Sequence, residues 1–469
     1  MIGGGDRQVR FLLLVGAVVS LALIGGIPAL IVVFSLVIMI VLHELGHYLA
    51  ARWCGMQVTE FFLGFGPRIW SIRKGETEYG IKAIPAGAYV RITGMNNLED
   101  VDPLLEDRTY RAQSYPRRLA VALAGSASHF FVAVFLLVLI FFTIGRPDPY
   151  SWTVGEIVPG STADLMGIAR GDRVLSVNDS DVESFDDFGG VVRLLAGENI
   201  EVSLERNEKV INENVKIGER LTVSGASVFP GLRPGDRVIS IDGVLVSGWS
   251  EIISVISDGS PHRLTIYRGL ETLDVVGSAT AEFPDKAEAV TGFFGIGAER
   301  EMTTLGFVDS TGRALSRFGN LASMSVESLV RFFTPDGLLN FIGGAVDRSP
   351  GASTSEVSSS AEEDDNRLLS IYGAARLGSA MFESGLHDYL WFLVIINVFI
   401  GIFNLVPLLP LDGGHVAIAT YERLRSWGGR RYQADVSKLI PVTWLVITVL
   451  VGVALVALYR DIVDFPDLG

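Results

Sequence analysis

Two histidines and a glutamate lie close together near the N-terminus, in the segment His43-Glu44-Leu45-Gly46-His47. Residues four apart in an α-helix differ by about 40° around the axis, so His43 and His47 would face the same side. Two neutral imidazoles on one face can supply half of a tetrahedral zinc site. Glu44 would lie beside the metal, where its carboxylate can act as general base toward a zinc-bound water. This spacing therefore predicts zinc-dependent attack of water on a peptide carbonyl.

The residues around this motif are almost wholly apolar. Residues 11 to 42 form one apolar run, and a helix that crosses a membrane needs about 20 such residues. Ionisable side chains inside a membrane are costly and are usually kept for function. The alternative is a pair of buried histidines hydrogen-bonded to the glutamate, but polar clusters inside membranes rarely lack a role. We therefore expect the zinc site to lie within the membrane.

A catalytic zinc site needs a third protein ligand and an open fourth position. Asp412 is the candidate, because it ends another apolar segment, in the sequence Asn404-Leu405-Val406-Pro407-Leu408-Leu409-Pro410-Leu411-Asp412. The alternative role of Asp412 is to cap the helix that would follow it. Pro407 and Pro410 would break the preceding helix, and irregular backbone at membrane depth is tolerated only beside protein or water. These prolines could therefore open a path for substrate and water.

Three further polar residues are candidates for supporting roles. Asn404 could donate a hydrogen bond to substrate or to an oxyanion, or it could join two helices. His129 lies in another apolar segment, as a polar neighbour of the site or as a core histidine. His415 either supports the site or lies at the membrane interface, and we do not assign it as a ligand. His262 and His387 lie in stretches outside the expected spans and carry no motif.

The composition favours a membrane protein and excludes some other classes. Of the 469 residues, 49% are hydrophobic and only 19% are charged, which is less charge than soluble domains usually carry. The formal net charge of −15 argues against a nucleic-acid partner, because proteins that bind nucleic acids present basic surfaces. The single cysteine, Cys54, excludes an internal disulfide.

The first apolar run is too long for one untilted helix, and Gly25-Gly26-Ile27-Pro28 interrupts it. We expect an extra transmembrane segment in residues 1–27, with its helix at about 9–25, followed by the zinc-motif helix in residues 28–55. The alternative is one long bent helix. Arg7 and Arg10 favour a cytoplasmic N-terminus by the positive-inside rule.

Three other apolar segments are long enough to span: residues 117–146, 387–412 and 439–460. Basic residues flank them at Arg117-Arg118 and in residues 413–438, for which we expect a basic cytoplasmic loop. The zinc site would then lie near the cytoplasmic side. The fold class that follows is a polytopic α-helical membrane protein with a core of about four transmembrane helices, plus one more if residues 1–27 span.

The stretches between the spans predict β-structure. Residues 56–116 begin with alternating apolar residues and turn signals, which predict a small membrane-associated antiparallel β-loop followed by a cytoplasmic connection. Residues 150–222 and 223–285 contain an internal repeat, in which Gly171-Asp172-Arg173-Val174 is echoed by Gly235-Asp236-Arg237-Val238. We expect the second repeat to be truncated, because the segment that precedes its Gly-Asp-Arg-Val motif is shorter than in the first repeat.

Residues 286–386 combine an apolar stripe at helical spacing with an acidic linker, residues 349–366. We expect the stripe to lie on the membrane or to pack on the repeats, and the linker to be flexible. The stripe consists of Leu315, Phe318, Ala322, Val326, Leu329 and Phe333.

These motifs together resemble the site-2 protease family of intramembrane metalloproteases. His43 to His47 is similar to the zinc-binding helix of that family, and Asn404 to Gly414 resembles its Asn-x-x-Pro-x-x-Pro-x-Asp-Gly segment. The duplicated Gly-Asp-Arg-Val segments resemble PDZ domains, which bacterial members carry outside the cytoplasmic membrane. The resemblance implies site-2 cleavage of a single-span membrane protein, such as an anti-sigma factor, within the lipid bilayer. It also implies that the PDZ units bind peptides or gate access.

The sequence departs from the family pattern in its third helix. The family usually has Gly-Pro-x-x-Asn there, whereas this chain has Gly125-Ser126-Ala127-Ser128-His129, so any contact of position 129 with substrate would use different donor chemistry. The alternative to an enzyme is a catalytically idle membrane scaffold whose PDZ units bind peptides. The intact Glu44, both histidines and Asp412 argue against the scaffold.

Overall fold

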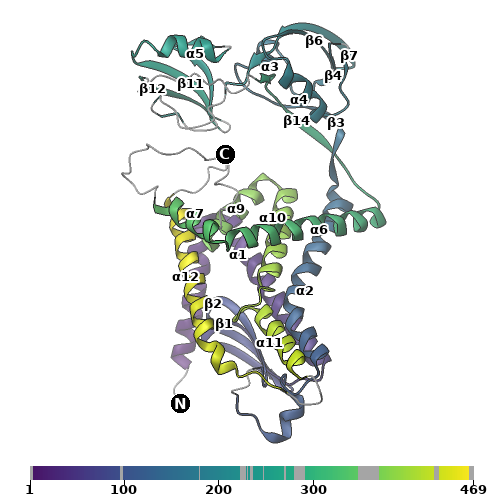
Figure 1. Ribbon diagram of the computed structural model, residues 1–469, viewed down its shortest axis with the longest axis vertical. Coiled ribbons are helices and arrows are strands. Elements are labelled where there is room, and N and C mark those ends of the chain that lie inside the picture. The colour runs from purple at the N-terminus through teal and green to yellow at the C-terminus, as the bar shows by residue number, and fades with distance from the viewer. Residues whose placement is uncertain are drawn as a thin grey trace. The chain divides into compact units, whose positions relative to one another are not determined.

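The structure is a computed structural model whose chain divides into two compact units, which we describe separately. The membrane unit contains Met1–Thr143, Leu305–Ser349 and Asn366–Pro466, and the β unit contains Ile144–Thr304 (Figure 1). The acidic segment 349–366 lies outside the described residues. Those residues are 4–95, 99–178, 180–221, 229, 231–232, 236–246, 248–268, 271–278, 291–346, 369–426 and 432–463.

Four helical segments of the described residues are long and apolar enough to cross a membrane: Gly25–Trp53, Tyr115–Ile144, Leu386–Phe403 and Val436–Ile462. They belong to α1 (Gly4–Trp53), α2 (Tyr115–Leu139) with its π-helical extension η2 (Ile140–Ile144), α10 (Leu386–Phe403), and η5 (Val436–Leu439) with α12 (Ile440–Val463). The chain is therefore a polytopic α-helical membrane protein.

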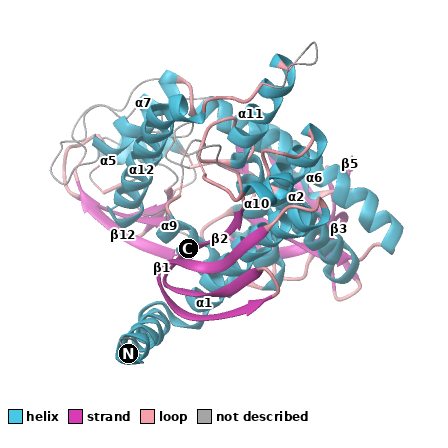
Figure 2. Ribbon diagram, turned by 90° about the horizontal axis from the view of Figure 1, so that it is seen from below, coloured by secondary structure: helices cyan, strands magenta, loops and turns pink. Residues whose placement is uncertain are grey.

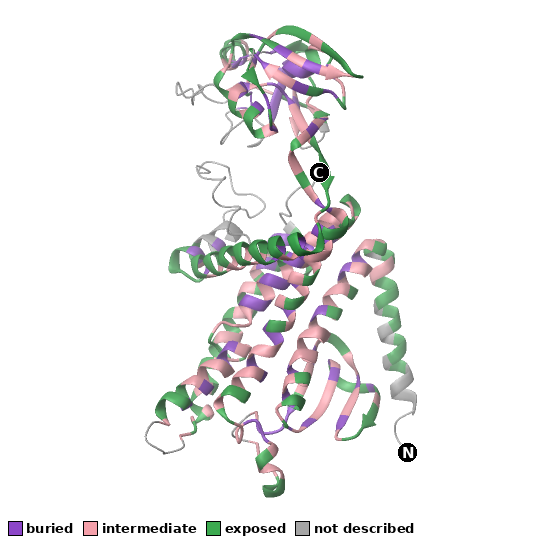
Figure 3. Ribbon diagram, turned by 90° about the vertical axis from the view of Figure 1, so that its right-hand side faces the viewer, coloured by how far each residue is buried: buried purple, intermediate pink, exposed green. Residues whose placement is uncertain are grey.

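Helix α1 runs through both of the segments that we expect from the first apolar run. It is broken at Gly26, whose φ of 70° and ψ of −174° are not helical, and glycine adopts such a backbone without steric cost. The candidate span begins at Gly25, and most of the side chains that the structure describes in the part of α1 before it are exposed (Figure 3). A separate crossing by residues 9–25 stays a prediction.

Small residues let the helices around the site approach closely. Gly46 of α1 lies against the backbone of Ala124 in α2, and Gly401 of α10 lies against Phe130 of α2. A larger side chain at either glycine would overlap its neighbour, which is how small residues allow helix packing in membranes. Apolar residues of α2 and α10, such as Leu137 and Val398, are fully buried between the helices.

The segment after α10 differs from the basic loop that the sequence predicts over residues 413–438. It contains the helix α11 (Asp412–Arg425), which packs on α2. Arg423 and Arg425 occupy its last turn, where cations interact favourably with the helix dipole. Glu422 forms a buried ion pair with Arg118 of α2 at 2.5 Å, and this pair ties α11 to the bundle.

A two-stranded sheet follows α1 and lies beside it (Figure 2). It is formed by β1 (Val58–Lys74) and β2 (Thr77–Ile92), and η1 (Pro103–Arg108) follows. The strands are bent, so that Phe61 pairs both with Val90 and with Tyr79. Several apolar side chains of this sheet are about half exposed: Phe65, Trp70, Ile72 and Ile84.

The amphipathic stretch packs within the membrane unit, where it forms α6 (Phe307–Phe332), α7 (Pro335–Val346) and α9 (Ile371–Ser384). Phe318 and Leu329 pack on the core formed by α2 and α10, whereas Leu315 and Val326 of the predicted stripe are about half exposed. The inner half of the predicted stripe therefore covers transmembrane helices of the membrane unit.

The β unit contains two modules with the same strand order. The first sheet, β5-β4-β6-β7, consists of Ser180–Asp181, Arg173–Val177, Asn199–Arg206 and Lys209–Lys216, with α3 (Thr162–Leu165) and α4 (Phe185–Leu194). The second sheet, β10-β9-β11-β12, consists of Val244–Leu245, Arg237–Ile241, His262–Arg268 and Glu271–Gly277, with α5 (Trp249–Ile256). Two further strand pairs complete the unit: β3 (Arg146–Ile157) with β14 (Ile296–Thr303), and β8 (Gly218–Glu219) with β13 (Gly292–Phe293).

The repeated aspartate makes the same contact in both modules. Asp172 accepts from Arg206 at 2.5 Å, and Asp236 accepts from Arg268 at 2.6 Å. Both aspartates are buried, with 2% and 1% of their surface exposed. The sequence repeat thus has a structural counterpart, in which the aspartate before one strand pairs with the arginine that ends the next long strand.

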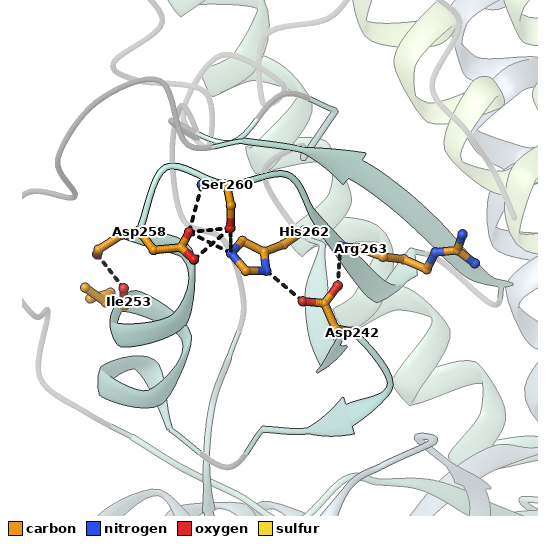
Figure 4. A network of polar contacts seen from close by, with 7 residues as sticks. Asp242, Ile253, Asp258, Ser260, His262 and Arg263 are labelled. Carbon is orange, nitrogen blue, oxygen red and sulfur yellow. Dashed lines mark hydrogen bonds and ion pairs between the residues drawn. The ribbon is translucent and has the colours of Figure 1, made fainter.

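A histidine joins three segments of the second module (Figure 4). His262 is buried, and its Nδ1 lies 2.7 Å from Asp242 while its Nε2 lies 2.9 Å from Asp258. Ser260 lies 3.0 Å from the same Nε2. Because carboxylates face both ring nitrogens, the protonated ring is favoured, and the hydrogen bond to Asp242 is the main cause of its raised pKa.

This network predicts that the second module loses stability as the pH rises. A raised folded-state pKa means that the stabilisation is complete below the usual value of about 6.5 and is lost as the pH passes the folded value. We expect amide protection of β9 and β11, corrected for intrinsic exchange, to fall as the pH rises above the ordinary histidine pKa of about 6.5. Hydrogen exchange of the full chain measures this, with β4 and β6 as the internal reference. The same pH dependence in His262→Gln would contradict the role of this ring.

Candidate metal centre

Three candidate ligands from opposite ends of the chain meet in the membrane unit. His43 and His47 lie on α1, and Asp412, 365 residues after His47, begins α11. Asp412 Oδ2 lies 3.3 Å from His43 Nε2 and 3.2 Å from His47 Nε2, and the two nitrogens lie 3.3 Å apart. Among the described residues this is the only group of three or more such side chains that could hold a metal ion.

The size of this triangle fits a tetrahedral zinc ion. Zinc lies about 2.0–2.1 Å from its nitrogen and oxygen ligands, so two corners of a regular tetrahedron are about 3.3–3.4 Å apart. The three observed edges of 3.2 to 3.3 Å match this spacing. Asp412 Oδ2 is also buried without a hydrogen bond, so this anionic oxygen needs a cation.

The backbone of α2 sets the tautomer of His47, one of the three candidate ligands. His47 Nδ1 lies 2.8 Å from the carbonyl oxygen of Val121, and a carbonyl can only accept, so Nδ1 donates. The neutral ring then carries its lone pair on Nε2, the atom that faces His43 and Asp412. A carbonyl behind a metal-binding histidine usually fixes the ring in this way.

Glu44 is adjacent to the ligands but is not one of the three groups in the triangle. It is partly buried, interacts electrostatically with His43, His47 and Asp412, and contacts the backbone of Val90 in β2. Its carboxylate is therefore available for proton transfer, and the sheet lies next to it.

Asp412 does not cap the helix that it begins. Leu411 is the N-cap of α11, Asp412 is the first helical residue, and no side chain makes a capping hydrogen bond there. The backbone carbonyl of Asn404 instead accepts from the amide of Gly413 at 2.7 Å. This contact closes the loop that contains Pro407 and Pro410 and holds Asp412 near α1.

A glycine of α2 forms the opposite wall of the site. A methyl group added at Gly125 would overlap His43 and the Nε2 atom of His47. Gly125, the first residue of the Gly-Ser-Ala-Ser-His segment, therefore leaves the space that the imidazole nitrogens of His43 and His47 occupy.

His129 is a polar neighbour of the ligands. Its ring centre lies 5.1 Å from that of His43, and its Nδ1 lies 2.9 Å from Asn397 Oδ1. Asn397 also donates to the carbonyl of Leu393 at 2.7 Å, which orients its amide. Sequence reasoning missed Asn397, although an amide within the apolar helix α10, seven residues before Asn404, was a usable signal.

The other two predicted supporting residues lie beside the site. The side chain of Asn404 is partly exposed and makes no hydrogen bond among the described residues, so it remains free to donate. His415 packs edge-on against Tyr110 at 6.4 Å and lines a cavity of about 220 Å³ with Arg118 and Leu409. It is not part of the ligand triangle.

Comparison with known proteins gives the family. The sequence model of peptidase family M50 matches residues 31–451. The chain is 30% identical to the zinc metalloprotease Rip1 of Mycobacterium tuberculosis over 463 residues, which are 92% of this chain and 97% of that protein. It is also 28% identical to the regulator of sigma-E protease RseP of Salmonella typhimurium over 468 residues, which are 90% and 96% of the two chains.

The match extends over the segments that provide the three candidate ligands, since residues 31–451 include both His43-Glu44-Leu45-Gly46-His47 and Asp412. The similarity to Rip1 of Mycolicibacterium smegmatis extends over nearly the full length of both proteins. The two sequences are 30% identical over 471 residues, which are 94% of this chain and 98% of that protein. The chain therefore belongs to peptidase family M50, the site-2 proteases, and is an intramembrane metalloprotease that uses zinc.

Proposed function

We propose that this enzyme cleaves single-span membrane proteins by site-2 cleavage, with zinc held by His43, His47 and Asp412 and with Glu44 as general base. The observation that carries the proposal is the triangle of ligand atoms with edges of 3.2 to 3.3 Å. A scaffold that only binds peptides would not need a buried carboxylate oxygen opposite two imidazole nitrogens.

The chemistry divides between the metal and the side chains. Zinc, when bound, polarises the substrate carbonyl and lowers the pKa of a water molecule to about 7. Glu44 accepts a proton from the attacking water at its carboxylate and delivers it to the amide nitrogen that leaves. The free amide of Asn404 can donate to the substrate backbone or to the developing oxyanion. His129 and His415 support the site without binding the metal.

The substrate class rests on two considerations. The catalytic helix is a candidate membrane span, so a peptide bond must reach the site inside the bilayer. A relative is named as a regulator of sigma-E protease, which makes an anti-sigma factor a suitable substrate. The two β modules serve in this proposal as extracytoplasmic PDZ domains that bind peptides or gate access, while the site lies near the cytoplasmic face of a bacterial inner membrane.

Glu44→Gln tests the assignment of the general base. Loss of a general base typically costs about 10²- to 10⁴-fold in rate, and glutamine keeps the shape of glutamate. We expect that loss in cleavage of a reconstituted single-span substrate, with the zinc content unchanged. Glu327→Gln, at an exposed position of α6, is the matched control and should cleave normally. Equal cleavage by Glu44→Gln and wild type would rule out Glu44 as the base.

Gly125→Ala tests whether α2 forms the wall of the metal site. The added methyl group would overlap both histidines, so we expect bound zinc and cleavage to fall together by about 5- to 150-fold, as a cost of about 1–3 kcal/mol for overpacking implies. Gly452→Ala is the control, because nothing lies within 4 Å of the added carbon. Metal analysis of the purified proteins measures the effect, and full zinc content in Gly125→Ala would contradict this packing.

A further inference from the structure

A second cavity lies between the end of α1 and the turn that joins β1 to β2. Its volume is about 640 Å³, and none of the three zinc-ligand candidates lines it. Its polar lining comes from both elements and from η1: Tyr48, Arg52, Lys74, Glu76, Tyr79 and Arg108.

This lining carries excess positive charge. Three cations face one carboxylate, so the net formal charge is +2. Arg108 forms two hydrogen bonds with Glu76, at 2.6 and 2.7 Å, and this pair is neutral. The excess charge therefore belongs to Arg52, which lies 3.8 Å from Glu76, and to Lys74, which is exposed and forms no ion pair among the described residues. Such a cavity fits a phosphate group.

The walls of the cavity are held in place without a ligand. The Tyr48 and Tyr79 hydroxyls lie 2.6 Å apart and join α1 to β2. Met56, which also lines the cavity, is buried, with 1% of its surface exposed. The hydrogen bonds between Arg108 and Glu76 fix the turn between β1 and β2. The cationic side chains thus surround a preformed space rather than an unstructured surface.

An apolar surface continues from the cavity. Alternate residues of a strand share a face, so Trp70 and Ile72 lie on the same face of β1 as Lys74, and Ile72 pairs with Tyr79 of the cavity wall. Trp70 is 53% exposed and Ile72 is 54% exposed. Trp53, at the end of the α1 span, is 87% exposed, and tryptophan is typical of the boundary between membrane and water.

We propose that this cavity binds the phosphate headgroup of an anionic phospholipid, whose acyl chains run along Ile72 and Trp70. The exposed apolar surface distinguishes a lipid from free phosphate, which would need only the cations. Bound lipid would hold the end of α1 against the sheet. The contact would include Tyr48, which directly follows the last histidine of the zinc motif. The inference depends on the membrane position of α1 but not on the proposed substrate or general base.

Lys74→Gln and Arg73→Gln form a matched pair. Both remove one exposed positive charge from neighbouring positions of β1, but alternation places Arg73 on the opposite face. We expect native mass spectrometry of the full chain to show about fivefold less retained phosphatidylglycerol for Lys74→Gln, as one basic residue near a membrane surface implies. Arg73→Gln should retain as much phosphatidylglycerol as the wild type. When phosphatidylcholine replaces phosphatidylglycerol, all variants should retain the same amount of lipid as the wild type. Equal losses in both variants would overturn the site, since they would show general surface attraction.

A second arm identifies the source of the phosphate. Trp70→Gln should lower phosphatidylglycerol retention without changing any charge. Inorganic phosphate at millimolar concentration should not displace the lipid from the wild-type protein. Displacement by inorganic phosphate would overturn the lipid assignment in favour of a free phosphate ligand. Normal lipid retention in Trp70→Gln would overturn the proposed path of the acyl chains along β1. Equal zinc content in all variants shows that each is folded.

Discussion

A buried carboxylate oxygen that faces two imidazole nitrogens is the constraint on which the membrane unit depends. Asp412 Oδ2 lies 3.2 and 3.3 Å from the nitrogens and makes no hydrogen bond. An anionic oxygen in an apolar bundle is costly unless a cation neutralises it. In the ligand set that we propose, one zinc ion would neutralise this oxygen and bind both nitrogens, and it would join the first large helix of the chain to a segment near its end.

Small residues in the surrounding helices make room for these three side chains. Gly46 lets α1 approach α2, and Gly125 leaves the volume in which the ligand nitrogens lie. The carbonyl of Val121 then orients His47. The loop after α10 brings Asp412 to the same place, and the Arg118–Glu422 pair holds the following helix against α2. The site therefore depends on close backbone packing as much as on its ligands.

Local sequence patterns predicted the parts of the structure that depend on spacing and polarity. The i, i+4 histidines and the acidic residue at the end of an apolar run identified His43, His47 and Asp412, and the repeated Gly-Asp-Arg-Val segments predicted two similar modules. The contacts of Asn397 with His129 and of Val121 with His47 span 268 and 74 residues. Such contacts follow from helix packing, which one sequence does not specify. The same reason explains why α11 and the inner packing of α6 were missed.

The zinc environment tests the central claim most directly, because it reports the ligands themselves. X-ray absorption at the zinc edge of the purified enzyme should show two imidazole nitrogens and one carboxylate oxygen at about 2.0–2.2 Å, with one further light ligand. In Asp412→Ala, either the spectrum should lack the carboxylate oxygen or the purified protein should contain no zinc. A third imidazole in the wild-type spectrum, or an unchanged spectrum with full zinc in Asp412→Ala, would contradict the ligand set.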